Sequence, residues 1–177
     1  MKSLLATICI LAMVGMVVVV LVKASDEGTV TSTVTIGEVA VTVATTTFDY
    51  GTMPFSASKE SFDVVSWSNG GGPFNNIRAT VGTVETDLDI KATSTAAWTL
   101  AATVDANQYV HKFATSTDGT TRPTGYAALT NDYASNVLAT NVVASGNVWF
   151  GLEIYTPTSG ESAQQSSPVS VRATWSE

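Results

Sequence analysis

The residues of this sequence that could perform nucleophilic or acid–base chemistry are few, and their spacing matches no catalytic motif. His111 is the only histidine among the 177 residues. It follows a strand-like pattern beside Lys112, and no serine lies in a nucleophile elbow, so a catalytic triad is not indicated. A zinc peptidase of the His-Glu-x-x-His type is excluded because that motif needs two histidines. We expect His111 to be a partly buried or edge-strand residue, and we predict that the protein is not an enzyme.

Three carboxylates, Glu85, Asp87 and Asp89, recur at every second position of one strand-like stretch. Side chains two residues apart on a strand share a face and lie about 7 Å from each other. Ca²⁺ binds six to eight oxygens, usually from loops that wrap around the ion. These residues are therefore a Ca²⁺ candidate only if neighbouring side chains complete the site. We otherwise expect a solvated face on which Lys91 is a counter-charge, with no other metal or cofactor.

Aromatic side chains offer a second kind of site, because exposed aromatic rings stack on sugars and bury area in protein contacts. Trp149 and Tyr155 fall on the outward face of a predicted strand, together with Gly151 and Glu153. This face is a candidate contact face for another subunit or for a ligand, or it is covered by a loop of the same chain. Trp98 and Trp175 fall on inward faces, and we expect both to be core residues.

The stretch Thr29–Val43 is long, prone to form strands and uncharged until Glu38. Its apolar residues alternate with threonine and form a candidate assembly surface: Val30, Val34, Ile36, Val39, Val41 and Val43. Gly37 interrupts the alternation, which indicates a bulge or a break between two strands. An exposed strand of this kind aggregates unless it is paired. It either pairs within its own domain or completes the sheet of a neighbouring subunit.

The first 24 residues consist of a basic start, an uncharged apolar run over Ser3–Val22 and a closing Lys23. As a helix this run would span about 30 Å, the thickness of a membrane hydrocarbon core. It is either a secretory signal cleaved after Ala24 or a retained helix that anchors the protein or packs inside a filament. Residues 25–28 then form a short linker, and residues 29–177 form a single domain.

Charge and composition restrict the partners of the domain. Without residues 1–24, six basic and 15 acidic side chains remain, a net charge of −9. Nucleic acid and anionic membrane surfaces both need clustered Lys and Arg, so we expect neither as a binding partner. The membrane is expected only during export or as the anchor. Cys9 is the only cysteine, so strand pairing and packing must supply the stability without an internal disulfide.

The composition predicts a mainly β domain, because the sequence is rich in β-branched residues and turn-forming Gly, Pro, Asn and Asp residues recur along it. We predict an antiparallel β-sandwich of eight to ten strands, of jelly-roll or immunoglobulin-like type, after one N-terminal hydrophobic helix. The inward faces we expect are those of Thr86, Leu88 and Ile90; of Val148, Phe150, Leu152 and Ile154; and of Val169, Val171, Ala173 and Trp175. Tyr109, His111 and Phe113 are expected to share one face of a further strand. A hairpin is expected at Ser145-Gly146, a strand over Phe62–Trp67 and one helical turn near Ala127–Leu129.

Short motifs resemble secreted sandwich proteins of the camelysin/TasA type. They are the apolar leader followed by Thr-Val-Thr-Ile-Gly-Glu-Val-Ala-Val-Thr-Val at 33–43, the strand Val64–Trp67 leading to Asn69-Gly70, and Asp87-Leu-Asp-Ile-Lys91. The resemblance covers about a third of the chain and implies a surface fibre. Camelysin is assigned as a peptidase, but no metal-ligand pattern here supports that activity. The leader and β-domain also resemble pilins that keep an N-terminal helix, although the apolar run contains no early glutamate.

These observations predict an extracellular or cell-surface protein whose role is structural. In this interpretation copies of the chain form a pilus-like filament or a surface layer through the N-terminal helix, through donated strand 29–43, or through both. The alternative is a membrane-anchored binding module that uses Trp149 and Tyr155 to hold glycan or protein.

Overall fold

A computed structural model describes residues 37–44, 47, 49–64 and 75–176 of the chain. This part is mainly β and contains two sheets, ten strands and one short 3₁₀ helix, η1 (Ser61–Asp63). The predicted N-terminal helix and residues 29–36 lie outside the described ranges. The chain contacts group residues 36–177 in one compact unit.

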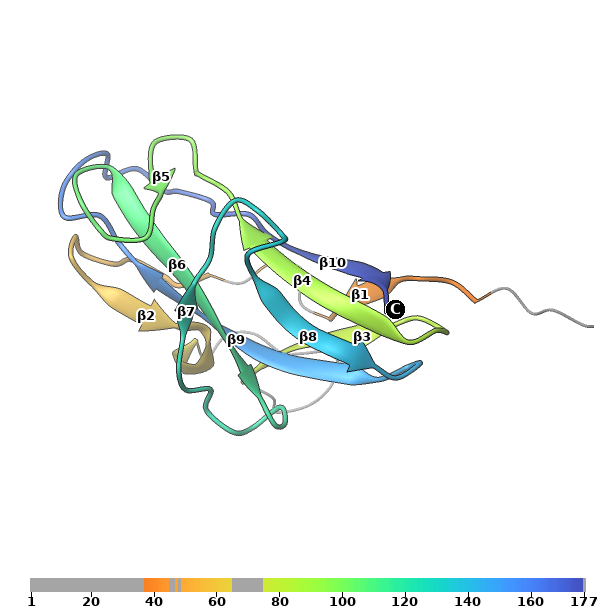
Figure 1. Ribbon diagram of the computed structural model, residues 1–177. Coiled ribbons are helices and arrows are strands. Elements are labelled where there is room, and N and C mark those ends of the chain that lie inside the picture. Colours follow the sequence, from red (N-terminus) through yellow and green to blue (C-terminus); the bar gives the residue numbers. More distant parts are fainter. Residues whose placement is uncertain (1–36, 45–46, 48, 65–74, 177) are drawn as a thin grey trace, which may run out of the picture. The chain divides into compact units, whose positions relative to one another are not determined.

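The larger sheet has seven strands (Figure 1). Its main order is β1 (Val41–Val43), β3 (Ile77–Val81), β9 (Asn147–Tyr155), β6 (Gln108–Ser116) and β5 (Thr99–Leu100). In addition β2 (Ser58–Glu60) pairs with β9, and β7 (Ala127–Ala128) pairs with β6. All these pairs are antiparallel except β5 with β6, which is parallel. The fully antiparallel prediction is wrong for that pair, because alternation along a strand does not encode its direction.

The smaller sheet has three antiparallel strands in the order β10 (Val169–Trp175), β4 (Thr86–Ala92) and β8 (Val137–Val142). The predicted alternation of β4 is confirmed, since every second residue from Thr86 to Ala92 is buried. Val171 lies opposite Ile90, and Ala173 lies opposite Leu88. Such facing apolar pairs fix the register, because a slip of one residue would turn them towards solvent.

One hydrophobic core is shared by the two sheets, and Figure 1 shows β4, β8 and β10 lying across β3, β6 and β9. Its buried members from β4 are Leu88, Ile90 and Ala92, and from β9 are Phe150 and Leu152. Other members come from β3, β6 and β8, and from Leu129 just after β7. The inward faces predicted for β4 and β9 are therefore confirmed. Packing of both sheets on this cluster supplies the hydrophobic stabilisation of the domain.

Five local predictions are wrong for the described residues. Trp175 is 61% exposed rather than buried, because β10 ends beyond the core. Trp98 is half-buried in the loop before β5 and donates from Nε1 to the Glu161 carbonyl at 2.9 Å. Ser145-Gly146 connects β8 in the small sheet to β9 in the large one, so it is no hairpin. Residues Ser61–Asp63 form η1 where the predicted strand Phe62–Trp67 begins, and residues 65–67 of that strand lie outside the described residues. Ala127–Ala128 form β7 where a helical turn was expected.

Candidate assembly surface

The first described strand, β1, forms one end of the larger sheet's strand order. Val41 lies opposite Val81, and Val43 lies opposite Ala79, so both valines face the core and pack against it. Thr42, between them, is exposed. Odd-numbered residues of β1 therefore face inward and even-numbered residues face outward.

The chain approaches β1 through a close contact with the turn between β3 and β4. The Gly82 amide donates to the Ala40 carbonyl at 2.8 Å, and the Glu38 amide donates to Thr83 Oγ1 at 3.0 Å. A Cβ atom on Gly37 would lie only 1.9 Å from Val84 Cγ1, so a side chain at this position would displace Val84. The conformation of residues 37–40 is thus fixed by contacts rather than by a continuous strand ladder.

Three large apolar side chains are exposed at the end of the domain where residue 37 lies. They are Val39, Val143 and Trp175, with exposed fractions of 37%, 64% and 61%. Figure 1 shows the segment before β1, the end of β10 and the β3–β4 and β8–β9 connections at the same end. Exposed apolar residues gathered at one place are typical of contact surfaces. This apolar end was not predicted, because it joins residues far apart in sequence.

Of the six predicted assembly residues, the structure describes three. Val41 and Val43 are half-buried on β1, and Val39 is exposed just before it. The other three, Val30, Val34 and Ile36, lie outside the described residues. Within the described part of the predicted strand, residues Val41–Val43 pair with β3 of their own chain.

Trp149 and Tyr155 lie on the outward face of β9, six residues or about 20 Å apart. Each ring is stacked with a cation: the Arg78 guanidinium lies 5.7 Å from the Trp149 ring centre, and Lys112 Nζ lies 4.1 Å from that of Tyr155. Lys112 also pairs with Glu153 at 3.7 Å. The two aromatics therefore do not form one continuous platform.

The face between them is covered by a loop from elsewhere in the chain. A Cβ atom on Gly151 would lie 2.8 Å from Pro123 Cγ and 2.9 Å from the Tyr126 hydroxyl. Tyr126 donates to Glu60 Oε2 at 3.2 Å, and burial raises the pKa of Tyr126. Arg122 pairs with Glu60 at 2.7 Å and also contacts Asp63, which fastens this loop over the sheet.

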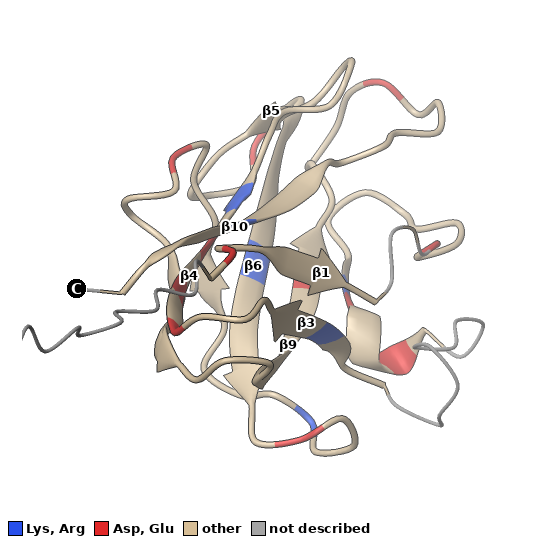
Figure 2. Cartoon of the chain, turned by 90° about the vertical axis from the view of Figure 1, so that its right-hand side faces the viewer, with Lys and Arg blue, Asp and Glu red and all other residues tan. Residues whose placement is uncertain are grey.

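The carboxylates of β4 are engaged within the chain. Asp89 Oδ2 accepts from Arg172 at 2.7 Å, and Asp87 Oδ1 accepts from the Asn141 amide at 2.7 Å. Glu85 is exposed just before the strand. Among the residues that the structure describes, no group of three or more His, Cys, Asp or Glu side chains is placed to hold a metal ion. Figure 2 shows Lys and Arg scattered over separate strands and loops.

His111 lies on β6, between β9 and the short strands β5 and β7, and is only 2% exposed, so the prediction of partial burial or an edge position is wrong. Its Nδ1 lies 3.0 Å from Ser167 Oγ, and its Nε2 lies 3.4 Å from the Tyr50 hydroxyl. Ser167 Oγ also lies 2.7 Å from the Tyr109 hydroxyl. Tyr109 donates in turn to the Thr93 carbonyl at 2.6 Å. This polar chain satisfies buried groups and ties β6 to the segment before β10.

Burial lowers the pKa of His111 to about 4, so the ring is neutral at pH 7 and is a poor general base. Burial also raises the pKa of Tyr50 and of Tyr109. A serine beside a histidine is the arrangement that activates a nucleophile. Here the low basicity of the ring favours a structural role for the pair.

Acidification is expected to destabilise the domain through His111. The unfolded chain binds a proton near pH 6.5 and the folded chain only near pH 4, so stability falls as the pH is lowered between these values. The loss attributable to His111 amounts to about 3 kcal/mol. Urea unfolding at pH 7, 5.5 and 4.5 should show a smaller pH dependence for His111→Gln than for the wild type. Equal pH dependence in both proteins would contradict this assignment.

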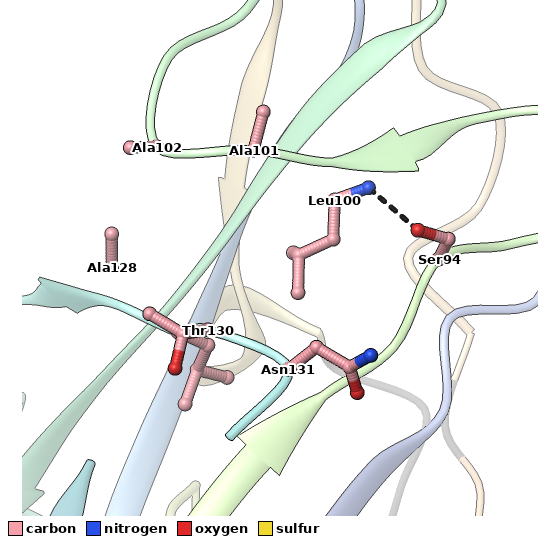
Figure 3. Close-up of a pocket in the computed structure, with 8 residues that line it drawn as sticks. Ser94, Leu100, Ala101, Ala102, Ala128, Thr130 and Asn131 are labelled. Atoms are coloured by element: carbon pink, nitrogen blue, oxygen red, sulfur yellow. Dashed lines mark hydrogen bonds between the residues drawn. The ribbon is translucent and has the colours of Figure 1, made fainter. Parts of the chain in front are cut away.

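A shallow pocket of about 300 Å³ lies beside β5 and β7 (Figure 3). Its walls include the small side chains of Ala101, Ala102 and Ala128, and Leu100 points into it towards Thr130 and Asn131. No charged residue lines it. The sequence offered no signal for this pocket, because its two walls come from segments separated by β6.

Comparison of the chain with protein-family models, curated proteins and solved structures finds no match. Within the described part of the chain, no helix has the length and apolar character needed to cross a bilayer. The function of the protein is therefore inferred from its own geometry and sequence.

Proposed function

We propose that the protein is a structural subunit of an extracellular filament or surface layer, built from copies of this chain. In this proposal the domain is a sandwich of jelly-roll or immunoglobulin-like type, antiparallel except for the β5–β6 pair. The N-terminal segment links one copy to the next. The apolar leader Ser3–Val22 supports export, and the net charge of −9 on the remainder supports a solvated exterior.

The observation that carries this proposal is the register of β1. Odd-numbered residues of β1 face the core of their own domain. An unbroken continuation of β1 towards the N-terminus would turn Thr33 and Thr35 to that core and leave Val30, Val34 and Ile36 facing solvent. Continuation of β1 therefore does not account for Val30, Val34 and Ile36, and the chain already leaves the β1 ladder at residues 37–40, where odd-numbered Val39 is exposed.

That apolar face needs another acceptor, and a neighbouring copy supplies one in the proposed filament. Strand addition gives affinity through main-chain hydrogen bonds and specificity through alternate side chains. Residues 37–40 contact the β3–β4 turn rather than a strand partner, so the proposed donated segment begins before Gly37. Packing of the Ser3–Val22 helices in a filament core is a second route, and the two routes are compatible.

The alternative of a binding module with an aromatic platform receives less support. Trp149 and Tyr155 are about 20 Å apart along β9, and Pro123 and Tyr126 lie over the strand between them. Each of the two rings already contacts a cation of its own chain. A glycan-array signal that disappears in Trp149→Ala would nevertheless favour the module.

Electron microscopy of the purified full chain tests the proposed function. We expect regular fibres or ordered layers whose amount rises steeply above a threshold protein concentration. Sedimentation should show the same threshold, because added copies enter the polymer once it has formed. Dispersed monomers at every concentration tested would contradict the proposal.

A further inference from the structure

The pocket beside β5 and β7 lies on the outer edge of the larger sheet. The nine-residue strand β6 is covered on that edge by only two two-residue strands, β5 and β7. The Ala101 amide donates to the Tyr109 carbonyl at 2.9 Å, and the Leu129 amide donates to the His111 carbonyl at 2.7 Å. The pocket opens between these two short segments because their side chains are mostly alanine.

The pocket and residue 37 lie at opposite ends of the domain. Strand β4 begins at Thr86, opposite Trp175, and ends at Ala92, opposite Val169. Ser94, which lines the pocket, follows just after β4, whereas residues 37–40 contact the turn just before it. The length of β4 separates the two places by about 20 Å. Figure 1 likewise shows β5 and the segment before β1 at opposite ends.

We propose that this pocket receives an apolar side chain from residues 30–36 of a second copy of the chain. The inference rests on the proposed function and specifies the acceptor of the donated strand. A contact between two different patches on opposite ends of a protein is heterologous, and its repetition generates an open filament or a ring. The pocket thereby explains how one domain both donates and accepts a strand.

The chemistry of the pocket fits a valine or isoleucine side chain. Its walls are alanine and leucine with a rim of Ser94, Thr130 and Asn131, and no charge would be desolvated on filling it. A volume of about 300 Å³ is at the small end of the range for ligand pockets, about 300–1,000 Å³. β5 ends the strand order of the sheet, and its outward Leu100 amide already donates to Ser94 Oγ at 3.0 Å, so the inserted side chain makes the contact with the second copy.

Mixed disulfide trapping tests the contact between copies. In a Cys9→Ser background, one population carries Val34→Cys, and a second, size-tagged population carries Ala128→Cys. After the two are mixed and oxidised, we expect disulfide-linked heterodimers of one untagged and one tagged chain in the polymer fraction. Thr140→Cys is the matched control in place of Ala128→Cys, since Thr140 is exposed on β8 of the smaller sheet. Heterodimer yields no higher than in this control would overturn the inference.

Filling the pocket is the second arm of the test. Ala128→Leu and, separately, Ala102→Leu should raise the threshold concentration for polymerisation at least tenfold while thermal unfolding stays unchanged. Ala102 is exposed at the pocket rim, so Ala102→Leu keeps the test valid if Ala128→Leu impairs folding. The pocket contact would be overturned if both variants formed fibres normally and the trapping experiment gave no specific disulfide. The filament proposal would then still stand. Absence of fibres in the wild type would instead contradict the proposed function itself.

Discussion

Replacing Val30, Val34 and Ile36 together by serine is expected to abolish polymerisation of the full chain. Burial of a valine or isoleucine side chain contributes about 1.5–3 kcal/mol, so three such changes remove at least about 4 kcal/mol from the contact between copies. A difference of 1.4 kcal/mol is tenfold in an association constant, so the threshold concentration should rise about a thousandfold. Sedimentation and electron microscopy of the variant measure this change.

The matched control for that variant changes the other face of the same stretch. Thr31, Thr33 and Thr35 alternate with the apolar residues, and their replacement by serine keeps a hydroxyl at each position. We expect this control to polymerise with a threshold within about tenfold of the wild type, because strand propensity alone changes. Normal fibres from the apolar-to-serine variant would show that the helices of Ser3–Val22 hold the polymer together without strand donation.

Phe150→Ala is expected to remove about 3–5 kcal/mol from the free energy of unfolding. Phe150 is 2% exposed on β9 and belongs to the core that both sheets share. The only cysteine is Cys9 in the leader, so no disulfide within the domain compensates for a cavity. A domain of this size has a total stability of about 5–15 kcal/mol, so the variant is expected to be close to unfolding.

Urea unfolding monitored by tryptophan fluorescence measures the effect of Phe150→Ala. Val143→Ala is the control, because Val143 is 64% exposed and its truncation should change stability by no more than about 0.5 kcal/mol. The assignment of a common core would be contradicted if the two variants lost the same small amount of stability.

The strands with strict alternation could be predicted from the sequence, whereas their partners could not. Leu88 and Ile90 on β4, and Phe150 and Leu152 on β9, are buried as predicted. Alternation reports which face of a strand is buried but not which strand lies beside it. The connection at Ser145-Gly146 therefore looked like a hairpin, although its two strands belong to different sheets.

The candidate sites could be predicted only in part. Whether a residue near a strand end is buried, and whether a loop far away in sequence covers a strand face, both depend on the fold. Trp175 keeps the inward alternation of β10 but lies beyond the core, so it is exposed. The loop over Gly151 is held by Arg122 and Glu60, which are 62 residues apart in sequence. The buried His111 ring likewise contacts Ser167 and Tyr50, neither of which any local motif identifies.

The β1 register suggests why the stretch Thr29–Val43 has two parts. Val41 and Val43 belong to the core of their own domain, whereas the apolar residues before Gly37 have the opposite alternation. In the proposed filament, the residues before Gly37 pack on a neighbouring copy. Val41 and Val43 attach this segment to the core of its own domain. The three-residue strand β1 then connects the donated segment to the larger sheet of its own domain.

A helical reconstruction of the fibres by electron cryomicroscopy tests the central claim most directly. The proposal predicts main-chain density for residues 30–36 running from one domain to the next, with Val30, Val34 and Ile36 buried against the second copy. Fibres in which residues 30–36 pack only on their own domain would contradict it.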